Sequence, residues 1–170
     1  MPKAVIKKHI DERLRNLIRL SKAEQKSTHS LSHISHLQFS KLAVLDVSGW
    51  IEITQDEIVQ KILRDKKISL TDINSFEEAH IKGNHSFDMK SFDSMITAAA
   101  GYNSYLKLKT TLGADHNLLS SKLGSLKKIR RELAHETRPS PSSVPSPKYV
   151  YDDYFLPIYN ILKKIESYSF

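Results

Sequence analysis

Leu42-Ala-Val-Leu-Asp-Val-Ser-Gly-Trp-Ile-Glu52 lies at the centre of a long apolar run that decides the fold. The apolar positions of this run are Leu37, Leu42, Ala43, Leu45, Val47, Trp50, Ile51, Ile53, Ile58, Ile62 and Leu63. They recur at helical spacing and cover nearly the whole circumference of the helix at its centre, and such a helix is normally enclosed by others. We therefore expect this segment to be the most deeply buried helix of an all-α protein.

Glycine and proline are scarce over most of the chain. The sequence has only five glycines, and its prolines are Pro2 and those from Pro139 onward, so little interrupts the helical periodicity. Pro2 suits the start of a first helix, whose apolar positions are Val5, Ile6, Ile10, Leu14, Leu17, Ile18 and Leu20. The sequence as a whole predicts an all-α bundle of about five to six helices.

Turn and capping residues divide the rest of the chain. Thr71-Asp72 indicates the start of a short helix, and Lys82-Gly83-Asn84 indicates its end. The following helix is expected to break near Gly101 and to end at Gly113, because glycine is the usual residue just past a helix. Asp115 is expected to cap the helix after it.

A segment rich in proline and serine separates the last helix from the others. Arg138-Pro-Ser-Pro-Ser-Ser-Val-Pro-Ser-Pro-Lys148 cannot continue a helix, so residues 138–148 are predicted to form a loop, whether functional or merely connecting. Helical spacing returns from Tyr149 to Phe170, where Pro157 is tolerable only near the helix start or at a kink. A length of 170 residues predicts one domain, 1–170.

The composition narrows the class of protein. The sequence has no cysteine, which excludes disulfides and thiolate metal sites. It also has no apolar run of the roughly 20 residues that a membrane span needs, and its N-terminus lacks the apolar core of a signal peptide. The sequence therefore predicts a soluble protein of the cytoplasm that makes no membrane contact.

Basic residues are in excess, and they are unevenly distributed. The formal net charge is +7 and the sequence pI is about 9.5. Lysine and arginine crowd residues 3–26 and 107–138, while the middle of the chain leans acidic. Two basic segments favour a polyanionic partner such as RNA, since neutralising phosphates releases counterions. Ordinary solvated helix faces would give the same pattern.

The chemistry of the chain is concentrated in Ile129-Arg130-Arg131-Glu132-Leu133-Ala134-His135-Glu136, near the end of a predicted helix. Arginine keeps its charge in a protein and histidine titrates near neutrality. The pair Arg130 and His135 therefore offers a fixed cation for a phosphate beside a proton carrier. This combination suits RNA cleavage without a metal, so we take both residues as candidate catalytic groups.

Arg130 falls at the edge of an apolar stripe formed by Leu119, Leu123, Leu126, Ile129 and Leu133. A guanidinium in that position needs a carboxylate, a partner subunit or a phosphate, unless it extends past the apolar surface to water. An acid within an apolar run also needs a partner. Glu52 is therefore the candidate orienting acid for Arg130, although Glu52 exposed on its helix is an equal alternative.

The two candidate catalytic residues do not share a helix face. At 100° per residue, His135 is rotated about 140° from Arg130. Either the helix unwinds near Ala134, or the working site combines two copies of the chain. Taken alone, His135 is more typical of a helix end, where it contacts the terminal carbonyls. Three further cations on this helix are candidate RNA-binding residues: Lys127, Lys128 and Arg131.

The pattern Arg130-x-x-x-Ala134-His135 at a helix end, followed by a loop and a last helix, resembles the HEPN superfamily. The segment Leu42-Ala-Val-Leu-Asp-Val-Ser-Gly-Trp-Ile-Glu52 resembles the RiboL-PSP-HEPN subgroup. The resemblance implies a helical bundle, usually a homodimer, that cleaves RNA without a metal and serves in toxin-antitoxin or antiviral systems. It also implies an antitoxin or defence partner protein and no cofactor.

The chain departs from the family pattern at two positions. Arg131 stands where the family commonly has asparagine, aspartate or histidine after the motif arginine. His135-Glu136-Thr137 lacks the tyrosine that some toxins of this type carry two residues after the histidine. The alternative to a ribonuclease is a non-catalytic helical module that binds RNA or protein, as an antitoxin or a scaffold does.

His29, His33 and His36 have the i, i+4, i+7 spacing that could share one helix face and resemble a metal site. The serine-rich sequence around them favours a polar connector, so we predict no metal site.

Overall fold

The computed structural model describes residues 8–26, 32–82, 86–135 and 144–170. Its elements, in chain order, are α1 (Lys8–Gln25), α2 (Ser32–Asp65), α3 (Leu70–Phe76), η1 (Glu77–Ile81), α4 (Met89–Ala100), α5 (Tyr102–Leu112), α6 (Ala114–His135), α7 (Pro147–Tyr149), η2 (Val150–Phe155) and α8 (Leu156–Ser167). The two η elements are single wide π-turns that continue α3 and join α7 to α8. The prediction of an all-α fold is confirmed, since the described ranges contain no strand.

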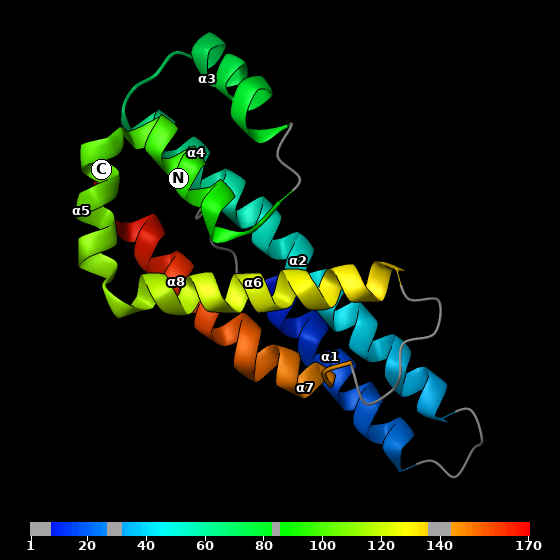
Figure 1. Cartoon of the computed structure of the whole chain (residues 1–170). Helices are drawn as coiled ribbons and strands as arrows, with labels where there is room; N and C mark the ends of the chain where they lie inside the picture. The colour runs from blue at the N-terminus through cyan, green and yellow to red at the C-terminus, as the bar shows by residue number, and fades with distance from the viewer. Residues whose placement is uncertain (1–7, 27–31, 83–85, 136–143) are drawn as a thin grey trace.

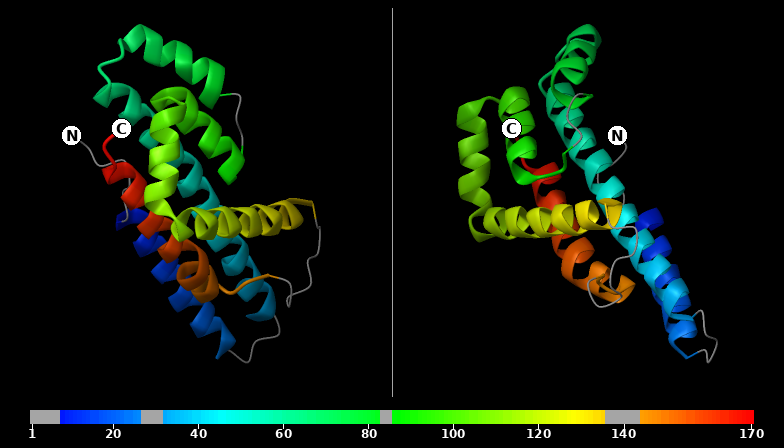
Figure 2. Two further views of the ribbon diagram at one scale, coloured as in Figure 1. Left: turned by 60° about the vertical axis from the view of Figure 1, so that its left-hand side comes forward. Right: turned by 45° about the vertical axis from the view of Figure 1, so that its right-hand side comes forward.

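The longest helix is the spine of the molecule. α1 packs antiparallel along the first half of α2, and α6 lies across the middle of α2 (Figure 1). α8 and η2 pack beneath α6 and alongside α2, while α4 covers the second half of α2 (Figure 2). α2 therefore contacts most of the other helices, as the apolar run predicted.

The core forms where these helices meet. Phe92 of α4, Leu123 of α6 and Phe155 of η2 have no measurable exposure. Trp50 packs edge-on against Phe155, with 5.1 Å between the ring centroids. Aromatic and leucine side chains from four helices thus fix where α6 crosses α2. This crossing positions the segment of α6 that contains Arg130 and His135.

α2 is not buried all round, contrary to the sequence-based expectation. Its buried side includes Val47, Ile51 and Ile58, but Leu42, Leu45 and Ile53 are exposed. The apolar residues therefore form two faces, and only one of them meets the rest of the chain.

The predicted break between α4 and α5 is confirmed, and two predicted helix starts need correction. Gly101 has φ of 89° and separates α4 from α5, a backbone conformation that favours glycine. Ser69, rather than Thr71, caps α3 by accepting from the Asp72 amide at 3.2 Å. Asp115 lies inside the first turn of α6, and it accepts a hydrogen bond from Lys164 at 2.5 Å.

The predicted loop 138–148 ends earlier than expected. Pro147 and Lys148 already belong to α7, which Ser146 caps by accepting from the Tyr149 amide at 3.2 Å. Proline suits that first position because it needs no amide donor there. Pro157 is the second residue of α8, in the first turn after the wide turn η2, where a helix accommodates a residue without an amide hydrogen. Residues 136–143, like Pro2, lie outside the described residues.

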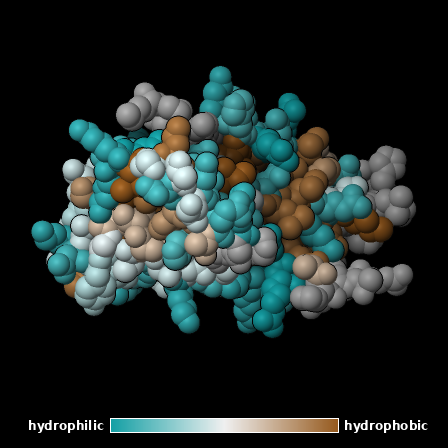
Figure 3. Space-filling view, turned by 90° about the horizontal axis from the view of Figure 1, so that it is seen from above, coloured by the Kyte–Doolittle hydropathy of each residue, from teal (hydrophilic) through white to brown (hydrophobic). Residues whose placement is uncertain are grey.

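The surface is mixed in character. Seen from above, hydrophilic side chains project over most of this face of the molecule, and exposed hydrophobic areas lie between them (Figure 3). Among the helices in the described ranges, none is long and apolar enough to cross a membrane.

Candidate functional site

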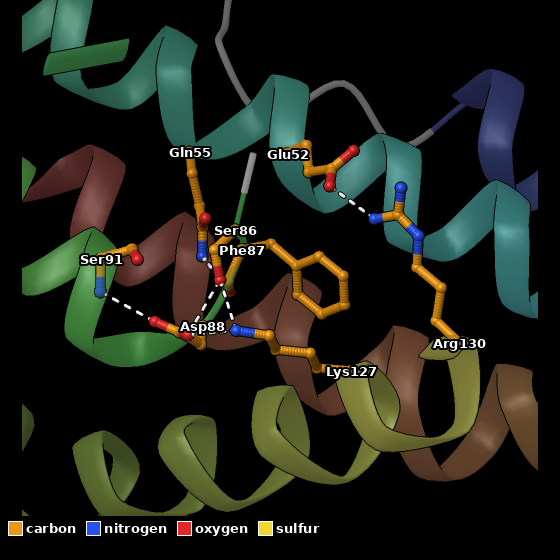
Figure 4. A network of polar contacts seen from close by, with 8 residues as sticks. All are labelled: Glu52, Gln55, Ser86, Phe87, Asp88, Ser91, Lys127 and Arg130. Carbon is orange, nitrogen blue, oxygen red and sulfur yellow. Dashed lines mark hydrogen bonds and ion pairs between the residues drawn. The ribbon is translucent and has the colours of Figure 1, made fainter. Parts of the chain in front are cut away.

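Arg130 of α6 meets Glu52 of α2 where the two helices cross. Nη1 of Arg130 donates to Oε1 of Glu52 at 2.5 Å (Figure 4). The side chains are 36% and 31% exposed, so the pair is partly shielded while one side of the guanidinium stays open. The predicted contact between these residues is confirmed.

An aromatic ring supports the guanidinium. The Cζ atom of Arg130 lies 5.5 Å from the ring centroid of Phe87, within the range of a cation–π interaction. Phe87 is itself buried, and its carbonyl accepts from Nε2 of Gln55 at 3.1 Å. The carboxylate and the ring together hold the guanidinium in one orientation, which suits a group that must meet a substrate atom.

A cleft of about 330 Å³ opens beside this pair. Its lining residues are Glu52, Gln55, Asp56, Ile81, Lys82, Ser86, Met95 and Arg130. Two cations and two carboxylates line the same space, so the cleft carries charged groups of both signs.

Asp56 is the titratable group of this cleft that the sequence reasoning missed. Partial burial, together with the nearby carboxylates of Glu52, Glu77 and Glu57, raises the pKa of Asp56 to about 6. Its position four residues after Glu52 places both acids on one side of α2, and this spacing could have identified it.

Lys127 is tied to α4, whereas the sequence suggested a solvated or phosphate-contacting cation. Its Nζ donates to Oδ2 of Asp88 at 2.6 Å and to the hydroxyl of Ser86 at 2.7 Å (Figure 4). Partial burial alone would raise the pKa of Asp88, but hydrogen bonds from Lys127, the Ser91 amide and Ser86 outweigh it and hold that pKa well below its usual range. Lys127 therefore joins α6 to the start of α4.

We predict that Lys127→Ala lowers the free energy of unfolding by about 1 kcal/mol at neutral pH, the usual size for a partly exposed charged hydrogen bond. Because folding lowers the pKa of Asp88, this stabilisation is present above about pH 4 and declines as the pH falls further. Urea titrations at several pH values measure the effect. Lys128→Ala is the matched control, and an equal loss in both variants would contradict the assignment.

The other two predicted RNA-binding cations are open to solvent. The Lys128 side chain is 80% exposed, and its Nζ lies 3.9 Å from Glu132. Arg131 is exposed and has no ion pair within the described part of the chain. Both remain candidates for contact with a polyanion.

His135 is the last residue of α6, and its side chain lies outside the described residues. The helix continues unbroken through Ala134, so the structure shows no unwinding there. Within one copy, the side-chain directions of Arg130 and His135 therefore differ by about 140°. The structure brings Arg130 to Glu52, but it does not bring Arg130 to His135.

The histidine segment was predicted to be a polar connector, but His33 and His36 belong to α2, so the prediction is wrong for the described part of the segment. Of His29, His33 and His36, only the side chain of His36 is described, and its Nδ1 is 2.5 Å from the Ser21 hydroxyl. Among the described residues, no group of three acidic or histidine side chains could hold a metal ion. Asp46, a second acid within the apolar run of α2, pairs with Arg13 at 2.7 Å.

Comparison of this chain with family models, with curated proteins and with solved structures finds no match.

Proposed function

We propose that this chain is a metal-independent endoribonuclease of the HEPN type, acting as a toxin or an antiviral defence effector in the cytoplasm. The observation that carries the proposal is Arg130, a partly exposed guanidinium that Glu52 and Phe87 hold at the mouth of a cleft. A fixed, oriented cation beside a cleft is what stabilisation of a developing phosphoryl charge requires. The helix that carries Arg130 ends on His135, which supplies the proton carrier.

In the proposed reaction, the 2′-hydroxyl of the RNA attacks the adjacent phosphorus, and the bond from phosphorus to the 5′-oxygen breaks. His135 moves the proton, and Arg130 stabilises the charge that develops on the phosphoryl oxygens. The products are a 2′,3′-cyclic phosphate and a 5′-hydroxyl. Glu52 acts as a positioning residue, since one nitrogen of Arg130 donates to it while the other donors of the planar group have no hydrogen-bond acceptor among the described residues.

The proposed working site combines two copies of the chain. α6 is helical through His135, which leaves the alternative of local unwinding without support. A two-fold homodimer would bring both motifs to one cleft. The exposed Lys128 and Arg131 would then contact the phosphates beside it.

The proposal predicts that the purified protein cleaves total RNA in the presence of EDTA. Fragments should carry 2′,3′-cyclic phosphate or 3′-phosphate ends, because no metal-bound water takes part in the reaction. Sequencing of fragment ends after treatment with a phosphatase that opens cyclic phosphates measures this directly. Cleavage that EDTA abolishes would contradict the proposal.

The Arg130–Glu52 pair also favours a second candidate function, a non-catalytic helical module that binds RNA or a partner protein. A guanidinium with a carboxylate at 2.5 Å already has the partner that its position requires, without any substrate. This candidate predicts RNA binding without cleavage. An antitoxin or a defence-system protein would be its partner.

A further inference from the structure

One side of α1 carries a line of cations that the proposed reaction does not use. Arg15, Arg19 and Lys22 recur at positions i, i+4 and i+7 of this helix. At 100° per residue, the directions of Arg19 and Lys22 lie within about 40° of Arg15, and that of Lys8 lies within about 20° of it. We call Lys8, Arg15, Arg19 and Lys22 the α1 stripe.

The α1 stripe faces solvent. All four of its residues are exposed, while Ile10 and Leu14 of the same helix are buried in the core. Ile10 and Leu14 lie about 140° and 100° round the helix from Arg15. Arg19 and Lys22 form no ion pair with any described residue. They therefore keep two positive charges available for a ligand.

A pocket of about 420 Å³ lies beside the α1 stripe, where α7 packs against α1 (Figure 1). Its charged and aromatic lining residues are Arg15, Arg19, Lys22, Lys148, Tyr151 and Asp152. The side chains of Lys148 and Asp152 are 62% and 42% exposed and pair with each other. The pocket lining thus has four cations and one carboxylate, and a concave surface of that charge attracts anions.

Arg15 is held in place although its side chain is 63% exposed. Its Nε donates to Oδ2 of Asp11 at 2.7 Å, and its Nη2 donates to the hydroxyl of Tyr151 at 2.7 Å. The same hydroxyl donates to Oδ1 of Asp11 at 2.6 Å, which closes the network. Nη1 of Arg15 has no acceptor within the described ranges. A guanidinium oriented in advance loses little freedom when it binds a phosphate.

The shape of the α1 stripe indicates which kind of anion it fits. From Lys8 to Lys22 the stripe runs about 21 Å along the helix, so it suits a row of phosphates better than a single one. A helix that binds a lipid surface carries large apolar side chains next to its cations. Within α1, Leu20 is the one exposed large apolar residue, and it lies about 140° from Arg15. These features favour the phosphodiester backbone of a nucleic acid over a membrane.

We propose that the α1 stripe and the pocket beside it bind the phosphodiester backbone of the RNA, at a surface separate from the Arg130 cleft. The choice of RNA as the nucleic acid rests on the proposed function. The pocket and the cleft share no lining residue. A contact away from the reacting phosphate is equally strong before and during the reaction, so this surface contributes to affinity and leaves the rate at saturating RNA unchanged.

The test measures binding of a labelled single-stranded RNA with 2′-O-methyl groups throughout, which the proposed reaction cannot cleave. The double variant Arg19→Ala, Lys22→Ala should raise the Kd on the order of 10-fold in about 0.1 M salt. The slope of log affinity against log salt should become shallower by about 1.4, since each phosphate contact of a single strand contributes about 0.7. Both residues are exposed, so the melting temperature should change little.

The matched control is Lys107→Ala, Lys163→Ala, which removes the same charge from exposed positions on α5 and α8. It should leave the Kd and the salt slope close to those of the wild type. Equal losses in the two double variants would show an effect of net charge alone and overturn the proposal. Sedimentation with vesicles of phosphatidylcholine and phosphatidylserine tests the membrane alternative. Binding of these vesicles through Arg19 and Lys22, without binding of RNA, would also overturn the proposal.

Cleavage of an unmodified RNA separates this surface from the proposed function. Arg19→Ala, Lys22→Ala should raise KM on the order of 10-fold and leave kcat unchanged, as the loss of uniform binding does. A wild type that binds RNA through the α1 stripe but cleaves none overturns only the proposed function. Cleavage with the same KM in the wild type and the double variant overturns only this surface. A wild type that neither binds nor cleaves RNA overturns both.

Discussion

His135→Ala should reduce RNA cleavage by about 10²- to 10⁴-fold, the usual cost of removing one acid–base group. The reduction should appear in the rate at saturating RNA, while the affinity for RNA stays within a few fold of wild type. His135 is the last residue of α6, so the change leaves the helix crossing and the core in place. Single-turnover cleavage of a labelled RNA, together with a filter-binding titration, measures the two quantities separately.

His135→Gln is the matched control for size and polarity, and it should be as inactive as the alanine variant because an amide does not carry protons. Both variants should retain the dimer mass, twice the 19.4 kDa of one chain. Equal cleavage by wild type and His135→Ala would refute the role of His135 and with it the proposed reaction. RNA binding by the wild type without any cleavage would instead favour the binding module.

Arg130→Ala should lower the rate of cleavage by about 10²- to 10³-fold, as the loss of one group that stabilises developing charge does. The same change leaves the Glu52 carboxylate beside the cleft without its cation, which adds repulsion toward phosphate. RNA binding should therefore weaken as well, in contrast to His135→Ala. Rate and affinity measured on the same RNA distinguish the two variants.

Arg130→Lys and Glu52→Gln separate a role in the reaction from a role in the fold. Lysine keeps the charge but loses the planar fork, so Arg130→Lys should recover only part of the rate. Glu52→Gln frees the guanidinium and should lower the rate while the melting temperature changes little. If Arg130→Ala instead unfolds the protein or only splits the dimer, with cleavage per dimer unchanged, the guanidinium is structural.

Much of the fold was predictable because helical periodicity and helix boundaries are local properties of the sequence. The spacing of apolar residues identified α2 as the central helix, and Gly101 marked the break between α4 and α5. The exposed side of α2 was not predicted. The spacing of Leu45 and Ile53 shows that they lie on one side of the helix. It cannot show whether that side of the helix packs against the rest of the chain or stays exposed.

The candidate site was predictable where a residue conflicted with its surroundings. A guanidinium at an apolar edge and a carboxylate in an apolar run each need a partner, and this requirement linked Arg130 to Glu52 across 78 positions. Lys127 shows the limit of such reasoning. It stands on the polar side of α6, where its sequence neighbours do not indicate that Asp88 and Ser86 lie within reach.

In the proposed ribonuclease, the working site takes Arg130 from one copy of the chain and His135 from the other. Each inactive variant alone should stay inactive, but Arg130→Ala and His135→Ala unfolded together and refolded as a mixture should regain activity. Random pairing gives half mixed dimers, each with one intact site of two, so recovery should reach about a quarter of the wild-type rate. A mixture as inactive as its components, beside a wild type that cleaves, would contradict the composite site.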